Sequence, residues 1–196
     1  MNNNYQPPRA EFLSGEKVYL RSIEPDDIAF LHNWANDPET RGLTGEIRPS
    51  SYADTLEFYQ KVQKNEDRIW LAVVLRETNQ TIGETGLLRM FPAWRTTDWS
   101  LIIGEKAARG KGYGTEVAQL MLNYAFGHLN FHRVAIGVVG FNTGALRFYE
   151  RLGFRREGIQ RDGYYYDHQY HDFLMLSMLE HEFLEKQREK VDRSLG

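Results

Sequence analysis

The chain has 196 residues, a net charge of −3, 41% apolar residues and no cysteine. This length supports one sizeable hydrophobic core, and the slight acidic excess gives no electrostatic basis for binding nucleic acid. The lack of cysteine excludes a disulfide framework, a thiolate nucleophile and a cysteine-ligated metal. The longest apolar runs, such as 70–75, are too short to span a bilayer, and the opening MNNNYQPPRA lacks the apolar stretch of a signal peptide. We therefore expect a cytoplasmic protein with no membrane partner.

Composition along the chain indicates one domain with short flanking segments. Residues 1–14 are polar, carry prolines and show no hydrophobic periodicity, which is typical of a flexible arm. Residues 15–183 contain the periodic segments and are expected to form a single domain. Residues 184–196 mix charges of both signs, which indicates a solvated tail or helix end.

Within that domain, strand-like and helix-like periodicities follow one another. Pro25 suits the first turn of a helix, and Gly153 stands where a left-handed residue ends one. The DHQ segment at 167–169 suits a tight turn, because Asp and His tolerate positive φ better than most residues. The expected elements are a strand over 17–22, helices over 24–37 and 50–62, a hairpin of 68–77 and 81–91, a strand over 96–104, a helix over 114–129, a strand over 133–140, a helix over 143–154 and a hairpin over 164–179. This order predicts a mixed α/β (α+β) fold rather than a regular doubly wound one.

A glycine run opens the helix that follows the strand over 96–104. Residues 108–114 read ARGKGYG, with three alternating glycines beside Arg109 and Lys111. Glycines allow close approach of backbone amides to a ligand, and a helix N-terminus carries unpaired N–H groups and partial positive charge. The loop therefore suits a phosphate, although a plain surface loop also explains it.

Two common phosphate motifs do not match this loop. The P-loop requires Gly-Lys-Ser/Thr after its first glycine and four further residues, and the chain has no such stretch. The dinucleotide fingerprint, counted from Gly110, requires a glycine where Thr115 stands. A nucleotide-binding domain is therefore disfavoured.

A second cluster, VVGFNTGALRFYERLGF at 138–154, gives the loop its context. With it the chain resembles the GNAT superfamily of acyl-CoA N-acyltransferases. One family signature is Gln or Arg, two residues, Gly, one residue, then Gly or Ala, and 109–114 satisfies it. The other is Asn, a Tyr on the next helix, then Gly-Phe, and 142–154 satisfies it. The opening 17–39 and the end 162–179 are similar to the branch that holds ribosomal-protein N-terminal acetyltransferases and spermidine N-acetyltransferases.

The resemblance implies a mostly antiparallel central sheet of about seven strands, splayed between two parallel central strands and flanked by about four helices. Acetyl-CoA, as cosubstrate, would lie in the V between strands 96–104 and 133–140. Backbone groups of the first strand would pair with the pantetheine arm like an added strand, and the loop amides would hold the pyrophosphate. The residues expected to contact the cofactor are Ile102, Ile103, Gly104, Arg109, Gly110, Lys111, Gly112, Tyr113, Gly114, Thr115, Asn142 and Tyr149.

The implied reaction is attack of a neutral amine on the thioester, without a covalent enzyme intermediate. Tyr149 is the resemblance-based general acid for the CoA thiolate, although it also fits plain packing on its helix face. Asn142 would hydrogen-bond the pantetheine or the Tyr149 region, or cap the helix at Thr143. Asp98 is the expected proton acceptor or substrate anchor, in a position where the branch often carries Glu, and a solvated edge carboxylate is the alternative. Glu84 is a second candidate base.

The remaining polar residues give weaker signals. The six histidines show no metal-ligand spacing, so we expect no metal. The acceptor stays open between a polyamine, a peptide or protein N-terminus and another small amine, and a homodimer is expected by analogy only. The main alternative function is a non-catalytic acyl-CoA-binding regulatory module, which would have no need of an acid at the thioester.

Overall fold

In the computed structural model, which describes residues 10–45 and 47–195, the chain forms one eight-stranded sheet in the order β1-β2-β3-β4-β5-β6-β8-β7. The β5–β6 pair is parallel and the other neighbouring pairs are antiparallel. The strands are β1 (Leu13–Ser14), β2 (Val18–Ser22), β3 (Ile69–Leu75), β4 (Thr81–Phe91), β5 (Thr96–Ile102), β6 (Arg133–Val139), β7 (Arg155–Tyr166) and β8 (Gln169–Leu179). This confirms the expected mixed, mostly antiparallel fold, with the two-residue β1 as the additional strand.

Six α-helices accompany the sheet in the described residues, against the four expected. They are α1 (Ile28–Asn36), α2 (Pro38–Thr44), α3 (Tyr52–Gln63), α4 (Tyr113–Asn123), α5 (Thr143–Leu152) and α6 (Glu180–Leu195). A π-helical turn, Tyr124–His128, extends α4, and a 3-10 turn, Pro25–Asp27, precedes α1. Sequence patterns missed α2, because its seven residues carry no apolar stripe; Asp37 caps it by accepting the Thr40 N–H at 3.0 Å.

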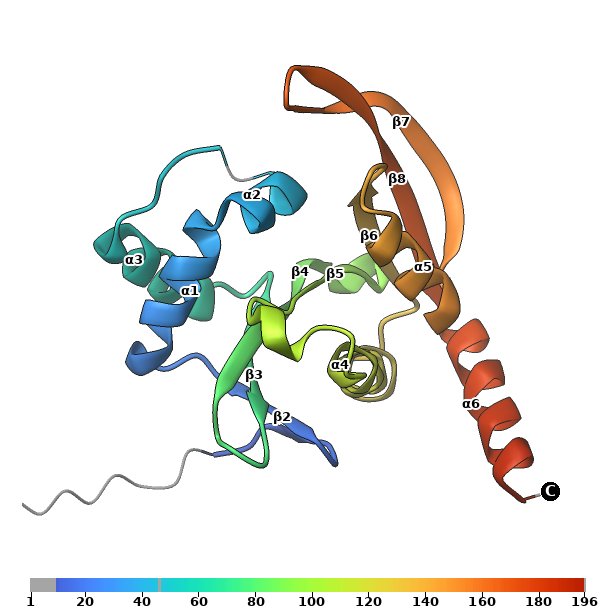
Figure 1. The fold of residues 1–196 in the computed structure, drawn as a ribbon. Helices are drawn as coiled ribbons and strands as arrows, with labels where there is room; N and C mark the ends of the chain where they lie inside the picture. Colours follow the sequence, from blue (N-terminus) through green and yellow to red (C-terminus); the bar gives the residue numbers. More distant parts are fainter. Residues whose placement is uncertain (1–9, 46, 196) are drawn as a thin grey trace, which may run out of the picture.

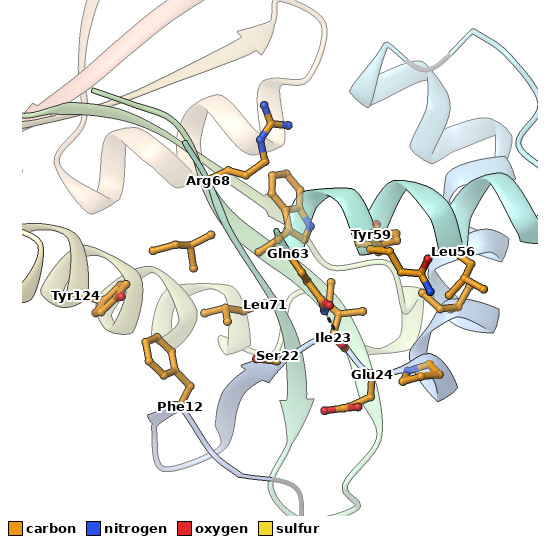
Figure 2. A pocket seen from close by; sticks show the side chains of 15 residues that line it. Phe12, Ser22, Ile23, Glu24, Leu56, Tyr59, Gln63, Arg68, Leu71 and Tyr124 are labelled. Carbon is orange, nitrogen blue, oxygen red and sulfur yellow. Dashed lines mark hydrogen bonds between the residues drawn. The ribbon is translucent and has the colours of Figure 1, made fainter. Parts of the chain in front are cut away.

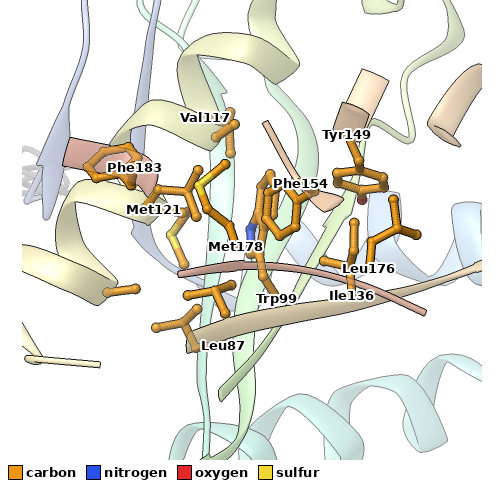
Figure 3. Packing of buried hydrophobic residues seen from close by; sticks show 14 of the residues in the cluster. Leu87, Trp99, Val117, Met121, Ile136, Tyr149, Phe154, Leu176, Met178 and Phe183 are labelled. Carbon is orange, nitrogen blue, oxygen red and sulfur yellow. The ribbon is translucent and has the colours of Figure 1, made fainter. Parts of the chain in front are cut away.

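The helices cover the two faces of the sheet as separate groups. Figure 1 shows α1, α2 and α3 gathered at one side of the molecule and α4, α5 and α6 at the other. The larger buried cluster lies beneath α4 and α5 and includes Trp99, Met121 and Tyr149 (Figure 3). The smaller one lies beneath α1 and α3 and includes Leu31 and Tyr59. We call these the α4 face and the α1 face of the sheet.

A buried ion pair seats α1 on its face. The two terminal guanidinium nitrogens of Arg21 donate to Asp27, at 2.6 and 2.9 Å, and each residue is about 1% exposed. The Thr81 hydroxyl and the Glu24 N–H also donate to the same carboxylate. Burial by itself raises the pKa of Asp27, but these hydrogen bonds outweigh it and leave that pKa below its usual value. The pair therefore joins β2 and β4 to the start of α1.

The parallel strands part after a short contact, as expected for a splayed sheet. Thr96, Thr97 and Asp98 of β5 pair with residues 133–135 of β6, and the pairing stops there. Beyond that point β5 stays paired with β4 as far as Ile102, and β6 stays paired with β8 as far as Val139. The facing edges of the two strands therefore form a V that widens toward their C-terminal ends.

The C-terminal hairpin confirms the predicted turn but is longer than expected. Asp167 and His168 both have positive φ, 48° and 62°, and connect β7 to β8. Gly153, at φ 108°, ends α5 as predicted. The first nine residues of β7, 155–163, were not expected as strand, because they are charged and exposed and show no alternation.

Both flanking segments lie partly within the described chain. Residues 1–9 of the expected arm are outside the described residues, and Leu13–Ser14 pairs with β2. The charged C-terminal stretch continues as α6 to Leu195. None of the helices within residues 10–45 and 47–195 is long and apolar enough to cross a membrane.

Candidate active site

The glycine loop presents a row of unpaired amides at the start of α4. Gly110 and Gly112 have φ values of 76° and 87°, in the left-handed region that glycine favours. Within the described residues, no hydrogen-bond acceptor pairs with the backbone N–H groups of residues 110–114. The N–H groups of Thr115 and Glu116 turn back to the Gly112 carbonyl. Five free amides at the positive end of a helix form an anion-binding surface.

The two cations of the loop behave differently. Arg109 turns away from the free amides: its Nε donates to the Ile103 carbonyl at 2.9 Å and its NH1 to Glu39 of α2 at 2.7 Å. Lys111 is exposed, and within the described chain it makes no ion pair. Arg109 therefore fastens the loop to the end of β5 and to α2, while Lys111 remains available to a ligand.

The residues at the end of β5 stand at the open edge of the V. Ile102 is the last strand residue, and the Ile103 carbonyl already accepts from Arg109. A Cβ added at Gly104 would overlap the indole of Trp34, so this glycine allows α1 to approach the strand end. Packing against Trp34 therefore allows no side chain at position 104. The backbone groups of Ile102 and Ile103 border the V.

Tyr149 is placed on the α4 face, where α5 meets the V. Its ring packs edge-on against Trp99 at 5.6 Å and against Phe154 at 5.7 Å (Figure 3). Burial raises the pKa of its hydroxyl to about 12. The hydroxyl makes no hydrogen bond to the described residues. A protonated donor without a protein partner is thus held beside the splayed strands.

Asn142 caps α5, which was one of its expected roles. Its Oδ1 accepts the Ala145 N–H at 3.1 Å and so caps α5, the helix that carries Tyr149. Its Nδ2 has no partner in the described part of the chain. Capping and ligand contact therefore use different atoms of this side chain, and one does not exclude the other.

The two candidate bases lie on the α1 face. Asp98 follows buried Thr97 and precedes buried Trp99, so alternation places its side chain opposite Tyr149. It forms an ion pair with Arg89, and its side chain is 25% exposed. Glu84 is buried, accepts hydrogen bonds from the Tyr59 hydroxyl and, at 2.7 Å, from Trp70 Nε1, and has its pKa raised by burial. Asp98 is the accessible carboxylate of the two.

Sequence patterns gave no signal for Arg89 and none for the partners of Glu39, which stood out only as one of several acidic residues near the first helix. Arg89 has a φ of 50° at an irregularity in the β4–β5 register, which turns its side chain toward Asp98. Glu39 lies on the unexpected α2 and accepts from both Lys106 and Arg109. Both pairings join residues that are neighbours only in the folded chain.

A large cavity touches none of the residues that border the V, although Tyr59 and Trp70, the partners of Glu84, line it. It measures about 620 Å³ and borders the stretch of β3 that extends past the end of β2 (Figure 2). Figure 2 shows Leu56, Tyr59 and Gln63 on one side of β3 and Phe12 and Tyr124 on the other. Strands β3 and β5 run in the same direction, because both are antiparallel to β4. The cavity lies at the N-terminal end of β3 and the V at the C-terminal end of β5, so they are at opposite ends of the sheet. In the described residues, no cluster of His, Asp or Glu has the arrangement of a metal site.

Comparison with known proteins gives a consistent result. Residues 17–155 match the family model described as acetyltransferase (GNAT) domain. An N-acetyltransferase 9-like protein of Caenorhabditis briggsae is 29% identical over 151 residues, covering 72% of this chain and 76% of the relative. A spermidine N(1)-acetyltransferase of Vibrio cholerae is 28% identical over 142 residues, covering 72% and 80%. The crystal structure of spermidine N-acetyltransferase from Vibrio cholerae in complex with CoA and spermine superposes with a TM-score of 0.81 at 25% identity, covering 87% of this chain and 99% of that one. The chain therefore belongs to the acetyltransferase (GNAT) domain family and is an N-acetyltransferase.

Proposed function

We propose that this enzyme transfers the acetyl group of acetyl-CoA directly to a primary amine. The proposal rests on three features that lie together at the V. They are the parted edges of β5 and β6, the five free amides at the start of α4, and the hydroxyl of buried Tyr149. The similar spermidine N-acetyltransferase from Vibrio cholerae forms a complex with CoA, which supports the same donor here.

The donor would lie along the V with its pyrophosphate on the loop. The amides of residues 110–114 are suited to the phosphate oxygens, and Lys111 adds charge. The backbone of Ile102 and Ile103 borders the pantetheine path, and the Asn142 Nδ2 supplies a further donor. In this arrangement Arg109 and Gly104 act on the shape of the site, because their contacts are with Glu39 and Trp34.

The chemistry needs one bond formed and one broken. The neutral amine attacks the thioester carbonyl carbon, a C–N bond forms, and the C–S bond breaks to release the CoA thiolate. Tyr149 donates to that sulfur, and its raised pKa keeps the hydroxyl protonated at neutral pH. The proton lost by the amine passes to Asp98, directly or through water, and solvent then returns a proton from Asp98 to the Tyr149 oxygen, so that acetylated amine and free thiol are the products and both side chains are restored.

The sequence alone also allowed a non-catalytic acyl-CoA-binding module, which membership of the N-acetyltransferase family disfavours and which experiment tests directly. Calorimetry with acetyl-CoA, together with thiol release from acetyl-CoA in the presence of polyamines, peptides and small amines, separates the two. Binding with turnover supports the enzyme, binding without turnover over the whole panel supports the module, and absence of binding contradicts both. Self-association stays a prediction, and sedimentation of the purified chain tests it.

Tyr149→Phe tests the role of the hydroxyl alone, because the ring that packs on Trp99 is kept. We expect kcat to fall about 100-fold or more, while the Kd for acetyl-CoA stays near the wild-type value. Tyr165→Phe, at an exposed tyrosine of β7, is the matched control and is expected to leave kcat unchanged. An unchanged kcat in Tyr149→Phe removes this residue as the acid.

A further inference from the structure

One row of residues crosses the α1 face of the sheet where β5 and β6 part. Trp70 of β3 pairs with Gly86 of β4, and Gly86 pairs with Ser100 of β5. Ser100 stands two residues beyond Asp98, the last β5 residue paired with β6, and Gly137 stands two residues beyond its partner Ala135. Alternation places all of these positions on the same face. The row therefore spans the beginning of the V on the side opposite Tyr149.

Two aromatic rings lie against the glycines of this row. A Cβ added at Gly86 would overlap the indole of Trp70, and a Cβ added at Gly137 would overlap the ring of Phe173 from β8. The Trp70 ring thus lies on β4, the neighbour of β5, and the Phe173 ring lies on β6, which borders the V. The two rings come from opposite directions, one across β4 and the other across β6.

The two rings are held to different degrees. Trp70 packs on the buried cluster beneath α3, and its Nε1 donates to Glu84, which the Tyr59 hydroxyl also holds. Phe173 is half-buried, yet it packs against neither buried cluster of the described residues. A large ring that contributes to no core and lies beside the V has a free apolar surface for a ligand.

The row offers few carboxylates. Asp98 is accessible and pairs with exposed Arg89, whereas Glu84 is buried between two hydrogen-bond donors. An acceptor carrying several positive charges would meet at most one accessible carboxylate in this row, and its extra charges would lose hydration without compensation. An amine with one charge and an apolar body would instead gain by removing that body from water against the rings.

We infer that Trp70 and Phe173 form the walls of the acceptor site, and that the acceptor is a primary amine carried on an apolar body rather than a polycationic amine. This inference rests on the proposed function. The apolar body would lie between the two rings over Ser100, with its nitrogen directed into the V toward the thioester.

The probes are 2-phenylethylamine and spermidine, each with acetyl-CoA and with thiol release as the readout. We expect kcat/KM to be at least about tenfold higher for 2-phenylethylamine, because the second and third charges of spermidine stay uncompensated. Phe173→Leu, which keeps an apolar side chain but loses the ring, should raise the KM for 2-phenylethylamine about tenfold. The KM for acetyl-CoA should stay within about twofold, because the variant is remote from the glycine loop.

Gly137→Ala provides a second variant, since its added methyl group displaces the Phe173 ring, and it should also raise the amine KM. Gly158→Ala is its control: this strand glycine of β7 has open space around an added Cβ and should behave as wild type. A higher kcat/KM for spermidine, unchanged amine KM values in both variants, or turnover of neither amine by a chain that binds acetyl-CoA would each overturn the inference. Failure to bind acetyl-CoA would instead contradict the proposed function itself.

Discussion

The two faces of β5 divide the proposed reaction between them. On the α4 face, Trp99 and Tyr149 belong to the main buried cluster, and the free amides of the glycine loop lie at the start of the helix that covers it. On the α1 face, Asp98 is half-buried and paired with exposed Arg89. The donor side is thus built from backbone geometry and core packing, and the acceptor side from side chains. Substitutions on the donor side would therefore disturb the fold, whereas side chains on the acceptor side can change without disturbing it.

The largest expected effect is a loss of stability that is confined to the α1 face and leaves the α4 face intact. Asp27→Asn leaves Arg21 buried without its counter-charge and should lower the free energy of unfolding by about 3–5 kcal/mol. Urea titration measures this, and hydrogen exchange should show α1 amides exchanging before those of α4. Glu57→Gln, in an exposed pair with Lys61, is the control and should cost less than about 1 kcal/mol. Equal losses in the two variants would contradict a structural role for the buried pair.

The same residue predicts a pH dependence. The pKa of Asp27 is lower in the folded than in the unfolded chain, so its contribution to stability is complete above the usual Asp pKa of about 4. That contribution is lost as the pH falls through the folded-state pKa. Wild type should therefore lose more stability than Asp27→Asn when urea titrations at pH 7 and at about pH 3 are compared. Parallel losses in both would show that Asp27 is not the group responsible.

A smaller effect tests whether the accessible carboxylate of the α1 face takes the amine proton. Asp98→Asn keeps the shape of the side chain but cannot accept that proton, and kcat/KM for the amine should fall about 100-fold, at the low end for a general base. Arg89→Gln removes only its surface partner and should change the rate less than about threefold. A near-wild-type rate in Asp98→Asn would identify Asp98 as a solvated edge carboxylate.

On the donor side, the backbone of the glycine loop is the expected determinant of affinity. Gly112→Ala forces a residue with a Cβ to a φ of 87°, at about 1–2 kcal/mol, although the added Cβ meets no atom. The Kd for acetyl-CoA, measured by calorimetry, should rise about tenfold as the loop leaves this conformation. Gly158→Ala is again the control. An unchanged Kd would show that these amides do not hold the pyrophosphate.

The smallest effect separates the two roles of Asn142. Asn142→Ala removes the cap of α5 and should cost about 1 kcal/mol, which thermal unfolding detects. Asn142→Asp keeps a capping oxygen but lacks the Nδ2 donor, so its Tm should stay near wild type while acetyl-CoA binds several-fold more weakly, at about 1 kcal/mol for one hydrogen bond. Wild-type affinity in Asn142→Asp would leave capping as its role.

Local sequence patterns predicted most of the fold because they act over a few neighbouring residues. The run 81–91 is the strand β4 with the expected bounds, and Gly153 ends α5 in the left-handed conformation. The helix α2 and the first part of β7, residues 155–163, were not predicted, for one shared reason. The first has no apolar stripe and the second has no alternation of apolar and polar residues. Their structure depends on contacts with distant segments, such as the Tyr164 hydroxyl donating to the Gly42 carbonyl at 2.8 Å.

The sequence by itself determined the family and the position of the glycine loop, and it made Tyr149 and Asn142 the candidate site residues, because these rest on short motifs with local geometry. Only the tertiary structure decided which face of β5 each group occupies, that Arg109 turns to Glu39, that Arg89 pairs with Asp98, and that Trp70 and Phe173 lie over Gly86 and Gly137. Those contacts follow from strand register and helix packing between segments far apart in the chain, and spacing along one sequence does not encode them.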